Sequence, residues 1–134
     1  MSVTAYLTPD LVIYTYRGSP IKFTIQPLLG GVAIADLPSY DQIEFSLWTG
    51  TREAPGTKQL TIKYKGAAPN YISVVDVDAG VGVSYAAQID IPDTVSLALP
   101  VASYFAELWI TPPGGKATFT GFAYWHHLPT TAGA

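Results

Sequence analysis

The chain has 134 residues, of which 49% are hydrophobic and only 13% are charged. It is long enough for one domain with its own core and too apolar for a disordered chain. Seven Lys and Arg against ten Asp and Glu give a net charge of −3, which disfavours nucleic acid and anionic membranes as partners. The absence of cysteine excludes disulfides and thiolate chemistry. We expect a single domain over residues 1–134 and find no compositional sign of catalysis.

The N-terminal residues 1–10 lack the basic and apolar regions of a secretory signal. The longest apolar runs fall far short of the ~20 residues that span a bilayer. We therefore expect synthesis in a cytoplasm and no membrane association.

Eleven prolines and twelve glycines are spread along the chain, which leaves little room for helices of ordinary length. Between these breakers, segments rich in β-branched and aromatic residues alternate with period two, which is typical of strands with one buried face. One short helical turn is expected near residues 94–100, as a plug over one end of the core, with Asp93 or Thr94 as its cap. In chain order, the predicted strands cover residues 11–16, 21–26, 41–49, 59–65, 71–77, 83–91, 104–111 and 116–124.

The last two predicted strands flank residues 112–115 (PPGG), a breaker cluster of hairpin-loop length that predicts an antiparallel hairpin. Seven or eight short strands joined by Pro and Gly turns predict an all-β fold, an antiparallel sandwich, with a small barrel as the alternative. The predicted core residues are Phe23, Ile25, Ile43, Phe45, Leu47, Leu60, Ile62, Ile89, Leu108, Ile110 and Phe122.

His126 and His127 are the only histidines. Adjacent residues on a strand point to opposite faces, so this pair is not expected to bind one metal or to form a base with its orienting partner. We expect both rings to be exposed to solvent near the C-terminus. Without a Gly-x-Ser-x-Gly motif, a hydrolase has little support.

Two short patterns resemble ligand-binding loops. Residues 76–80 (DVDAG) resemble the start of a calcium loop but lack its third ligand and its distal Glu, which indicates an ordinary acidic turn. Residues 80–82 (GVG) have no following helix or Lys-Ser/Thr pair, which indicates a turn between strands. Acid–base catalysis by the aspartates between residues 76 and 93 stays open on their closeness in sequence alone. We expect no metal and no cofactor.

Aromatic residues are in excess, with nine Tyr, three Trp and five Phe. Several lie opposite core-facing positions on the predicted strands, so the outer face of a sheet would also be apolar. Such a face marks an interaction site, either for protein subunits or for sugar rings that stack on flat side chains, unless the second sheet or the termini cover it. The predicted docking residues are Trp48, Phe105, Trp109, Tyr124 and Trp125.

The order of motifs resembles a family of tailed-phage virion domains. These are Ig-like sandwiches similar to the N-terminal domain of siphophage baseplate upper proteins. The resemblance covers roughly residues 12–127. It differs from the family pattern at Ser19 and Glu107, where members carry Asp, and at residues 36–39 (DLPS), where members carry Asp-Leu-Thr-Gly. The motifs that carry it are residues 16–25 (YRGSPIKFTI), 34–37 (IADL), 40–48, 93–100 and 104–121 (YFAELWITPPGGKATFTG).

This resemblance implies a non-enzymatic virion protein with an Ig-like fold. Its partners would be other capsid, neck or tail subunits, including further copies of itself. It would act by docking onto the head, as a decoration or cement protein, or onto the neck, tail or baseplate. Residues 1–10 and 127–134 are expected as extended arms, with frayed termini as the alternative. The other candidate function is a carbohydrate-binding module that uses exposed Trp and Tyr, for example in host adhesion.

Overall fold

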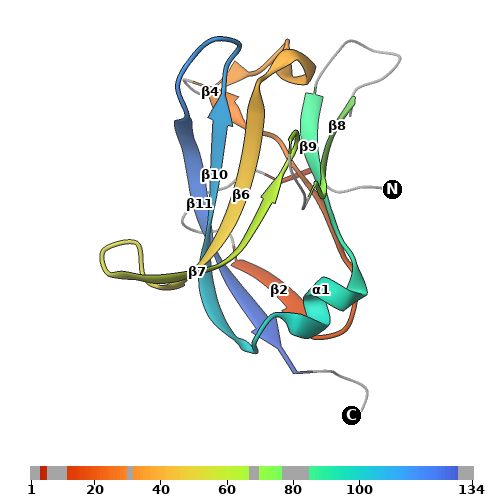
Figure 1. Cartoon of the computed structure of the whole chain (residues 1–134), viewed down its shortest axis with the longest axis vertical. Helices are drawn as coiled ribbons and strands as arrows, with labels where there is room; N and C mark the ends of the chain where they lie inside the picture. Colours follow the sequence, from red (N-terminus) through yellow and green to blue (C-terminus); the bar gives the residue numbers. More distant parts are fainter. Residues whose placement is uncertain (1–3, 6–11, 30–31, 67–69, 77–84, 130–134) are drawn as a thin grey trace.

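A computed structural model describes residues 4–5, 12–29, 32–66, 70–76 and 85–129. The chain forms two β-sheets packed face to face, with a short helix at one end (Figure 1). The smaller sheet has the strand order β1-β3-β9-β8. Its strands are β1 (Thr4–Ala5), β3 (Ile21–Ile25), β9 (Tyr85–Ile91) and β8 (Ile72–Asp76).

The larger sheet has the order β2-β11-β10-β6-β7 and is antiparallel except for the parallel pair of β2 with β11. A separate two-stranded hairpin joins β4 (Leu28–Leu29) to β5 (Val32–Ala33), before the 3-10 turn η1 (Leu37–Ser39). The strands of the larger sheet are β2 (Val12–Tyr16), β11 (Thr118–Leu128), β10 (Ala102–Thr111), β6 (Gln42–Gly50) and β7 (Pro55–Lys63).

The predicted all-β sandwich is confirmed, and its strand order follows that of an Ig domain, except that β1 pairs with β3 in parallel. The smaller sheet has the arrangement of strands A, B, E and D, and the larger sheet has that of G, F, C and C′ with β2 added at its edge. Each of the eight predicted strands is present. The two-residue strands β1, β4 and β5 were not predicted, because two residues are too few to show a period.

The connection between the two sheets near β10 also follows the Ig pattern. Helix α1 (Asp93–Ala98) is the short helical segment predicted near residues 94–100, and it lies at one end of the sandwich (Figure 1). Its N-cap is Pro92, without a side-chain cap, so neither predicted capping residue acts as one. Tyr104, near the start of β10, donates its hydroxyl to the Pro100 carbonyl, which is the tyrosine corner of Ig-like domains.

Three aromatic rings, one from the smaller sheet and two from the larger, join the two sheets. Phe23 of β3 contacts Phe45 of β6 and Trp125 of β11, with ring centroids 5.9 and 5.6 Å apart. The rings of Phe45 and Trp125 are 5.7 Å apart. These edge-on and tilted contacts are favourable geometries for aromatic pairs, so the cluster ties the sheets without any cysteine.

Most predicted core residues are buried, and one prediction is wrong. Phe23 and Leu60 are half-buried and pack against the core. Phe122 lies on the outer face of the larger sheet instead, under the side chain of Arg52. The core positions of this part of β11 hold Gly121 and Ala123, since these residues pair with the inward-facing Leu108 and Ala106.

Some predictions fall outside the described residues. These are the acidic turn beyond Asp76, the glycine turn at residues 80–82 and most of the two predicted arms. Within the predicted arms, Thr4 and Ala5 form β1, and His127 and Leu128 end β11.

Candidate functional site

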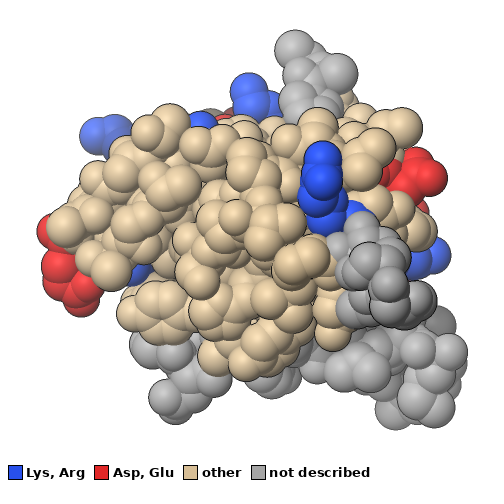
Figure 2. Space-filling model, turned by 90° about the horizontal axis from the view of Figure 1, so that it is seen from below, with Lys and Arg blue, Asp and Glu red and all other residues tan. Residues whose placement is uncertain are grey.

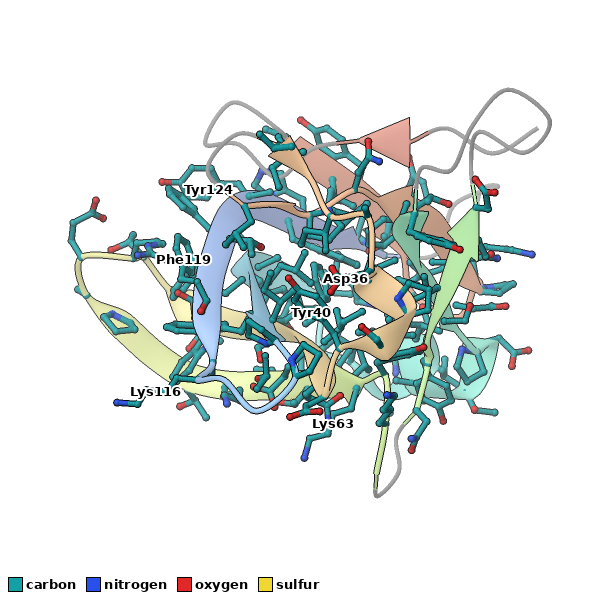
Figure 3. All side chains as sticks on the ribbon, turned by 90° about the horizontal axis from the view of Figure 1, so that it is seen from above. Asp36, Tyr40, Lys63, Lys116, Phe119 and Tyr124 are labelled. Carbon is teal, nitrogen blue, oxygen red and sulfur yellow. The ribbon has the colours of Figure 1, made fainter. Side chains whose placement is uncertain are left out.

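The outer face of the larger sheet is rich in aromatic side chains. It carries alternate residues of each strand, and a β-bulge opposite Leu108 and Trp109 lets β11 present both Phe119 and Phe122 on this face. Phe119 and Tyr124 point away from the smaller sheet (Figure 3). The predicted docking residues Trp48 and Trp109 are half-buried on this face, while Tyr124 is exposed.

One end of this face, over β2 and β11, presents exposed apolar side chains. We call Val12, Tyr14, Tyr16, Tyr124 and His126 the β2–β11 strip. Tyr14 is 62% exposed, and the other apolar members are each more than a third exposed. The Tyr14 and His126 rings are 5.4 Å apart. The strip therefore offers a contiguous apolar surface with polar hydroxyls at its tips.

Strand β2 also has an open edge. Among the described strands only β11 pairs with β2. The Arg17 amide donates to the Leu128 carbonyl, so residues 13 and 15 direct their backbone groups to β11, and residues 12, 14 and 16 direct theirs outward. An apolar cleft of about 340 Å³ follows this edge between β2 and β3.

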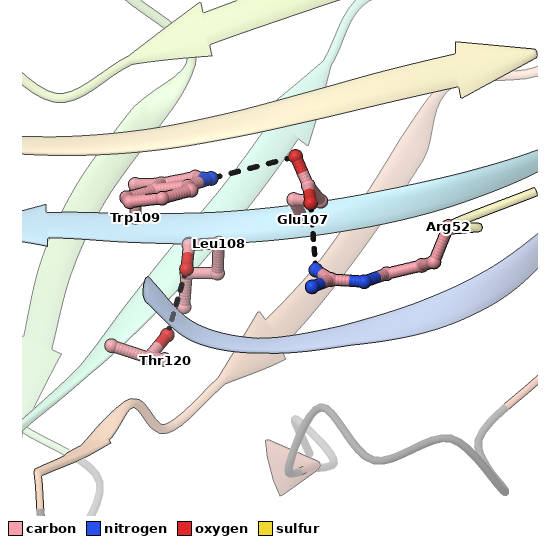
Figure 4. Close-up of polar contacts among 5 residues, drawn as sticks. All are labelled: Arg52, Glu107, Leu108, Trp109 and Thr120. Carbon is pink, nitrogen blue, oxygen red and sulfur yellow. Dashed lines mark hydrogen bonds and ion pairs between the residues drawn. The ribbon is translucent and has the colours of Figure 1, made fainter. Parts of the chain in front are cut away.

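The middle of the face is held by Arg52 from the β6–β7 turn. This turn needs a glycine at position 50, where φ is +82° and a Cβ would meet the Ala54 carbonyl. The Arg52 guanidinium lies 4.3 Å from the Phe119 ring centroid and binds the Glu107 carboxylate at 2.7 Å. Glu107 also accepts a weak hydrogen bond from the Trp109 indole at 3.5 Å (Figure 4).

Beyond Arg52, a groove of about 290 Å³ lies between β6, β7 and β10. Trp48 and Trp109 stand in its walls with Lys58, and Glu44 is also among its lining residues. The Trp48 ring is parallel to the Phe105 ring, with centroids 6.3 Å apart. The Lys58 ammonium lies 5.2 Å from the centroid of the Trp48 ring. The groove is thus bounded by rigid rings and hydrogen-bonding groups.

Two of the predicted docking residues are not on the surface. Trp125 is fully buried in the core, in the cluster with Phe23 and Phe45. Phe105 faces outward but is only 2% exposed, between Trp48 on β6 and Tyr124 on β11. For Trp125 the prediction is corrected because both faces of β11 are apolar, so alternation alone does not tell which side is interior. For Phe105 the predicted direction is right, but its neighbours cover the ring.

His127 is likewise buried, at 1% exposure, which overturns the expectation of a solvent-exposed ring. Its Nε2 donates to the Ser96 carbonyl (2.9 Å) and its Nδ1 lies 2.8 Å from the Thr15 hydroxyl, which accepts the Trp125 indole N–H at 2.8 Å. Because a carbonyl only accepts and an indole only donates, the Thr15 hydroxyl donates to Nδ1. This series of hydrogen bonds attaches α1 to β2 and β11. His126 points to the opposite face, as predicted.

The important surface residues that the sequence did not identify lie in β2 and in the β6–β7 turn. Val12, Tyr14 and Tyr16 alternate with the inward-facing Ile13 and Thr15, and this pattern is visible in the sequence. By itself, this pattern indicates only a strand. Arg52 lies in a polar turn, and its position over two rings depends on the curvature of the β6–β7 hairpin.

Charges are few around these features. At the end of the molecule that carries α1, most of the surface is uncharged, with one basic side chain on the face and the other charged side chains near the edge of the view (Figure 2). Burial, with a smaller effect from Asp36, raises the pKa of the Tyr40 hydroxyl near η1 (Figure 3). Burial also raises the pKa of Tyr104. Both phenols are structural, so neither marks a catalytic site.

The described part of the chain contains no group of three or more His, Asp or Glu residues placed to hold a metal ion. None of its helices is long and apolar enough to cross a membrane. Comparison of the sequence with known protein families and with curated proteins gave no match.

Proposed function

We propose that the protein is a non-enzymatic structural subunit of a tailed-phage particle, which docks onto neighbouring head, neck, tail or baseplate subunits through the β2–β11 strip. The observation that carries the docking is the exposed aromatic strip beside an edge of β2 that no described strand pairs with. The phage assignment is supported by the motifs in residues 16–25 and 104–121.

The composition of the strip favours a protein partner. Tyrosine gives a large contact area with few rotatable bonds and a hydroxyl that stays hydrogen-bonded at an interface, so it is a common anchor residue. The strip contains no acidic or basic side chain apart from His126, and interface centres are likewise poor in charge. Positions in a virion are repeated by symmetry, so we expect the neighbours to include further copies of this chain.

The backbone of β2 supports a particular docking mode. The outward N–H and C=O groups at residues 12 and 14 can pair with an extended segment of a neighbour, which would lengthen the larger sheet by one strand. The cleft between β2 and β3 would receive apolar side chains from that segment.

The assignment is tested on particles of the phage that encodes the protein. Mass spectrometry of purified particles should detect the protein at a fixed ratio to the major capsid protein, and the adjacent genes should encode head or tail proteins. Particles made without the gene should lack a surface density or lose stability. Absence of the protein from washed particles would refute the assignment.

A further inference from the structure

The groove between β6 and β10 lies apart from the β2–β11 strip, and it has its own floor and walls. In the sheet register, Trp109 pairs with Glu44, Glu107 with Ser46, and Phe105 with Trp48. The two indoles are therefore about 13 Å apart along the strands, with Ser46 and Glu107 between them. This length suits a short chain of linked rings better than a single small molecule.

Trp109 is a preorganised platform. Phe119 abuts its ring edge-on from the β11 side, with centroids 5.5 Å apart, and Glu107 accepts its indole N–H. Arg52 in turn fixes Glu107 by the ion pair. The groove lies on the β6 side of the ring, where no described aromatic side chain covers Trp109. Because the Trp109 ring is already held in place, little side-chain entropy is lost when a ligand stacks on it.

Polar groups of the groove are available for hydrogen bonds. Neither the Glu44 carboxylate nor the Ser46 hydroxyl makes a hydrogen bond or ion pair with any described residue. Trp48 Nε1 is the one buried side-chain polar atom in the described chain without a hydrogen-bond partner. The groove walls thus hold the Glu44 carboxylate and the hydroxyl of Ser46, a residue that is 2% exposed, and neither group is paired with a described residue; Trp48 Nε1 is itself buried.

The charge balance selects a neutral ligand. Glu107 is neutralised by Arg52. Glu44 lies opposite Lys63 in the β6–β7 register, and Lys58 lies opposite Trp48 at the other end of the groove. A cation attracted by Glu44 and Trp109 would be repelled by Lys58, and an anion would meet the unpaired carboxylate. Sugar rings combine apolar C–H faces with closely spaced hydroxyls and carry no charge, which matches an indole beside a carboxylate and a hydroxyl.

We propose that this groove binds a neutral oligosaccharide, with one sugar ring stacked on Trp109 and its hydroxyls hydrogen-bonded to Glu44 and Ser46. The site is independent of the proposed docking through the β2–β11 strip. It would give the protein a glycan contact, on the host surface or on a glycosylated partner, in addition to its protein contacts.

The test uses the intact protein and follows its three indole N–H signals by NMR during titration with cellotriose, maltotriose, mannotriose, chitotriose and galactotriose. We expect at least one trisaccharide to shift the signals of Trp48 and Trp109. The signal of Trp125, which is buried against Thr15, is the internal reference and should not move.

Variants assign the binding to the groove. Trp109→Ala should weaken it at least about tenfold and Glu44→Gln several-fold, roughly 1.4 kcal/mol per factor of ten. Tyr14→Ala, on the same face outside the groove, should bind like wild type. Glu44→Gln preserves shape and keeps the test valid if Trp109→Ala fails to fold.

Three results would overturn the proposal. These are no shift with any of the trisaccharides, shifts that persist unchanged in both groove variants, or shifts with tetramethylammonium but not with the sugars. Because Tyr14→Ala affects docking but not the groove, failure of the glycan site and failure of the docking face are distinguishable.

Discussion

Phe45 is the central residue of the ring cluster that joins the sheets. It is fully buried and contacts rings from both sheets. Phe45→Ala removes these contacts and leaves a cavity, so we expect a loss of about 3–5 kcal/mol in the free energy of unfolding. Urea denaturation measures it, with the exposed Tyr14→Ala expected within about 0.5 kcal/mol of wild type. A loss below about 1 kcal/mol for Phe45→Ala would contradict the cluster's role.

Tyr104 makes the free energy of unfolding depend on pH in the alkaline range. Burial raises its pKa, so the folded chain keeps the phenol proton at pH values where the unfolded chain, with a pKa near 10, has lost it. The stabilisation is therefore complete below about pH 10 and declines as the pH rises through the folded pKa.

Tyr104→Phe should cost about 1–2 kcal/mol at neutral pH, because the Pro100 carbonyl loses its donor. Above about pH 10 the difference between wild type and variant should shrink. Unfolding free energies across this pH range measure the difference, and Tyr40 contributes the same background to both proteins. A difference that does not change with pH would argue against this assignment.

At the level of single residues, the sequence predicted the core better than the surface. Ile43, Phe45 and Leu47 alternate with polar residues on β6, so their inward direction was readable. On β11 both faces are apolar: the inner face holds Gly121, Ala123 and Trp125, and the outer face holds Phe122 and Tyr124. There the register with β10 decides, because Trp125 pairs with the inward-facing Tyr104 and Phe122 with the outward-facing Glu107.

Among the elements, α1 is attached in part by the buried hydrogen-bond network of Thr15 and His127, beside the hydrogen bonds that Ser96 and Leu97 make with residues 16–18. Thr15→Val keeps the shape of the side chain but leaves the Trp125 N–H and the His127 Nδ1 unpaired in the interior. We expect a loss of roughly 2–5 kcal/mol and faster hydrogen exchange in α1. Thr94→Val, on the exposed side of the helix, is the matched control. Equal stability of the two variants would show that this network does not hold the helix.

Strand β2 permits a test of how docking occurs. If a neighbour adds a strand, the outward amide of Tyr14 is needed as well as its ring. Tyr14→Pro removes both and Tyr14→Ala only the ring, so incorporation into particles should fall further with Pro. Both variants should keep the β2–β11 pairing, which circular dichroism and melting can check. Equal incorporation would favour side-chain contacts without strand addition.

The eight long strands and the β10–β11 hairpin were readable because each keeps its period between Pro or Gly breakers. The groove could not be predicted from the sequence, although Trp48 and Trp109 are both among the predicted docking residues. Its formation requires β6 and β10 to be neighbours in a particular register, and that pairing is a long-range property with no local signal.

For the whole molecule, one fold supports two separate surfaces. The larger sheet turns one face to the core, and its outer face is divided by Arg52 into the β2–β11 strip and the groove. A sandwich with few charges and an apolar outer face is suited to burial among other subunits. The central claim is that this strip makes the docking contact.

Incorporation of variants into phage particles tests this claim most directly. Tyr14→Ala combined with Tyr124→Ala is supplied to particles that lack the wild-type gene, and the protein is quantified against the capsid protein by mass spectrometry. Leu97→Ala, an exposed apolar residue on α1, is the control. The account predicts at least an approximately tenfold loss for the double variant and none for Leu97→Ala. Wild-type incorporation of a folded double variant would contradict it.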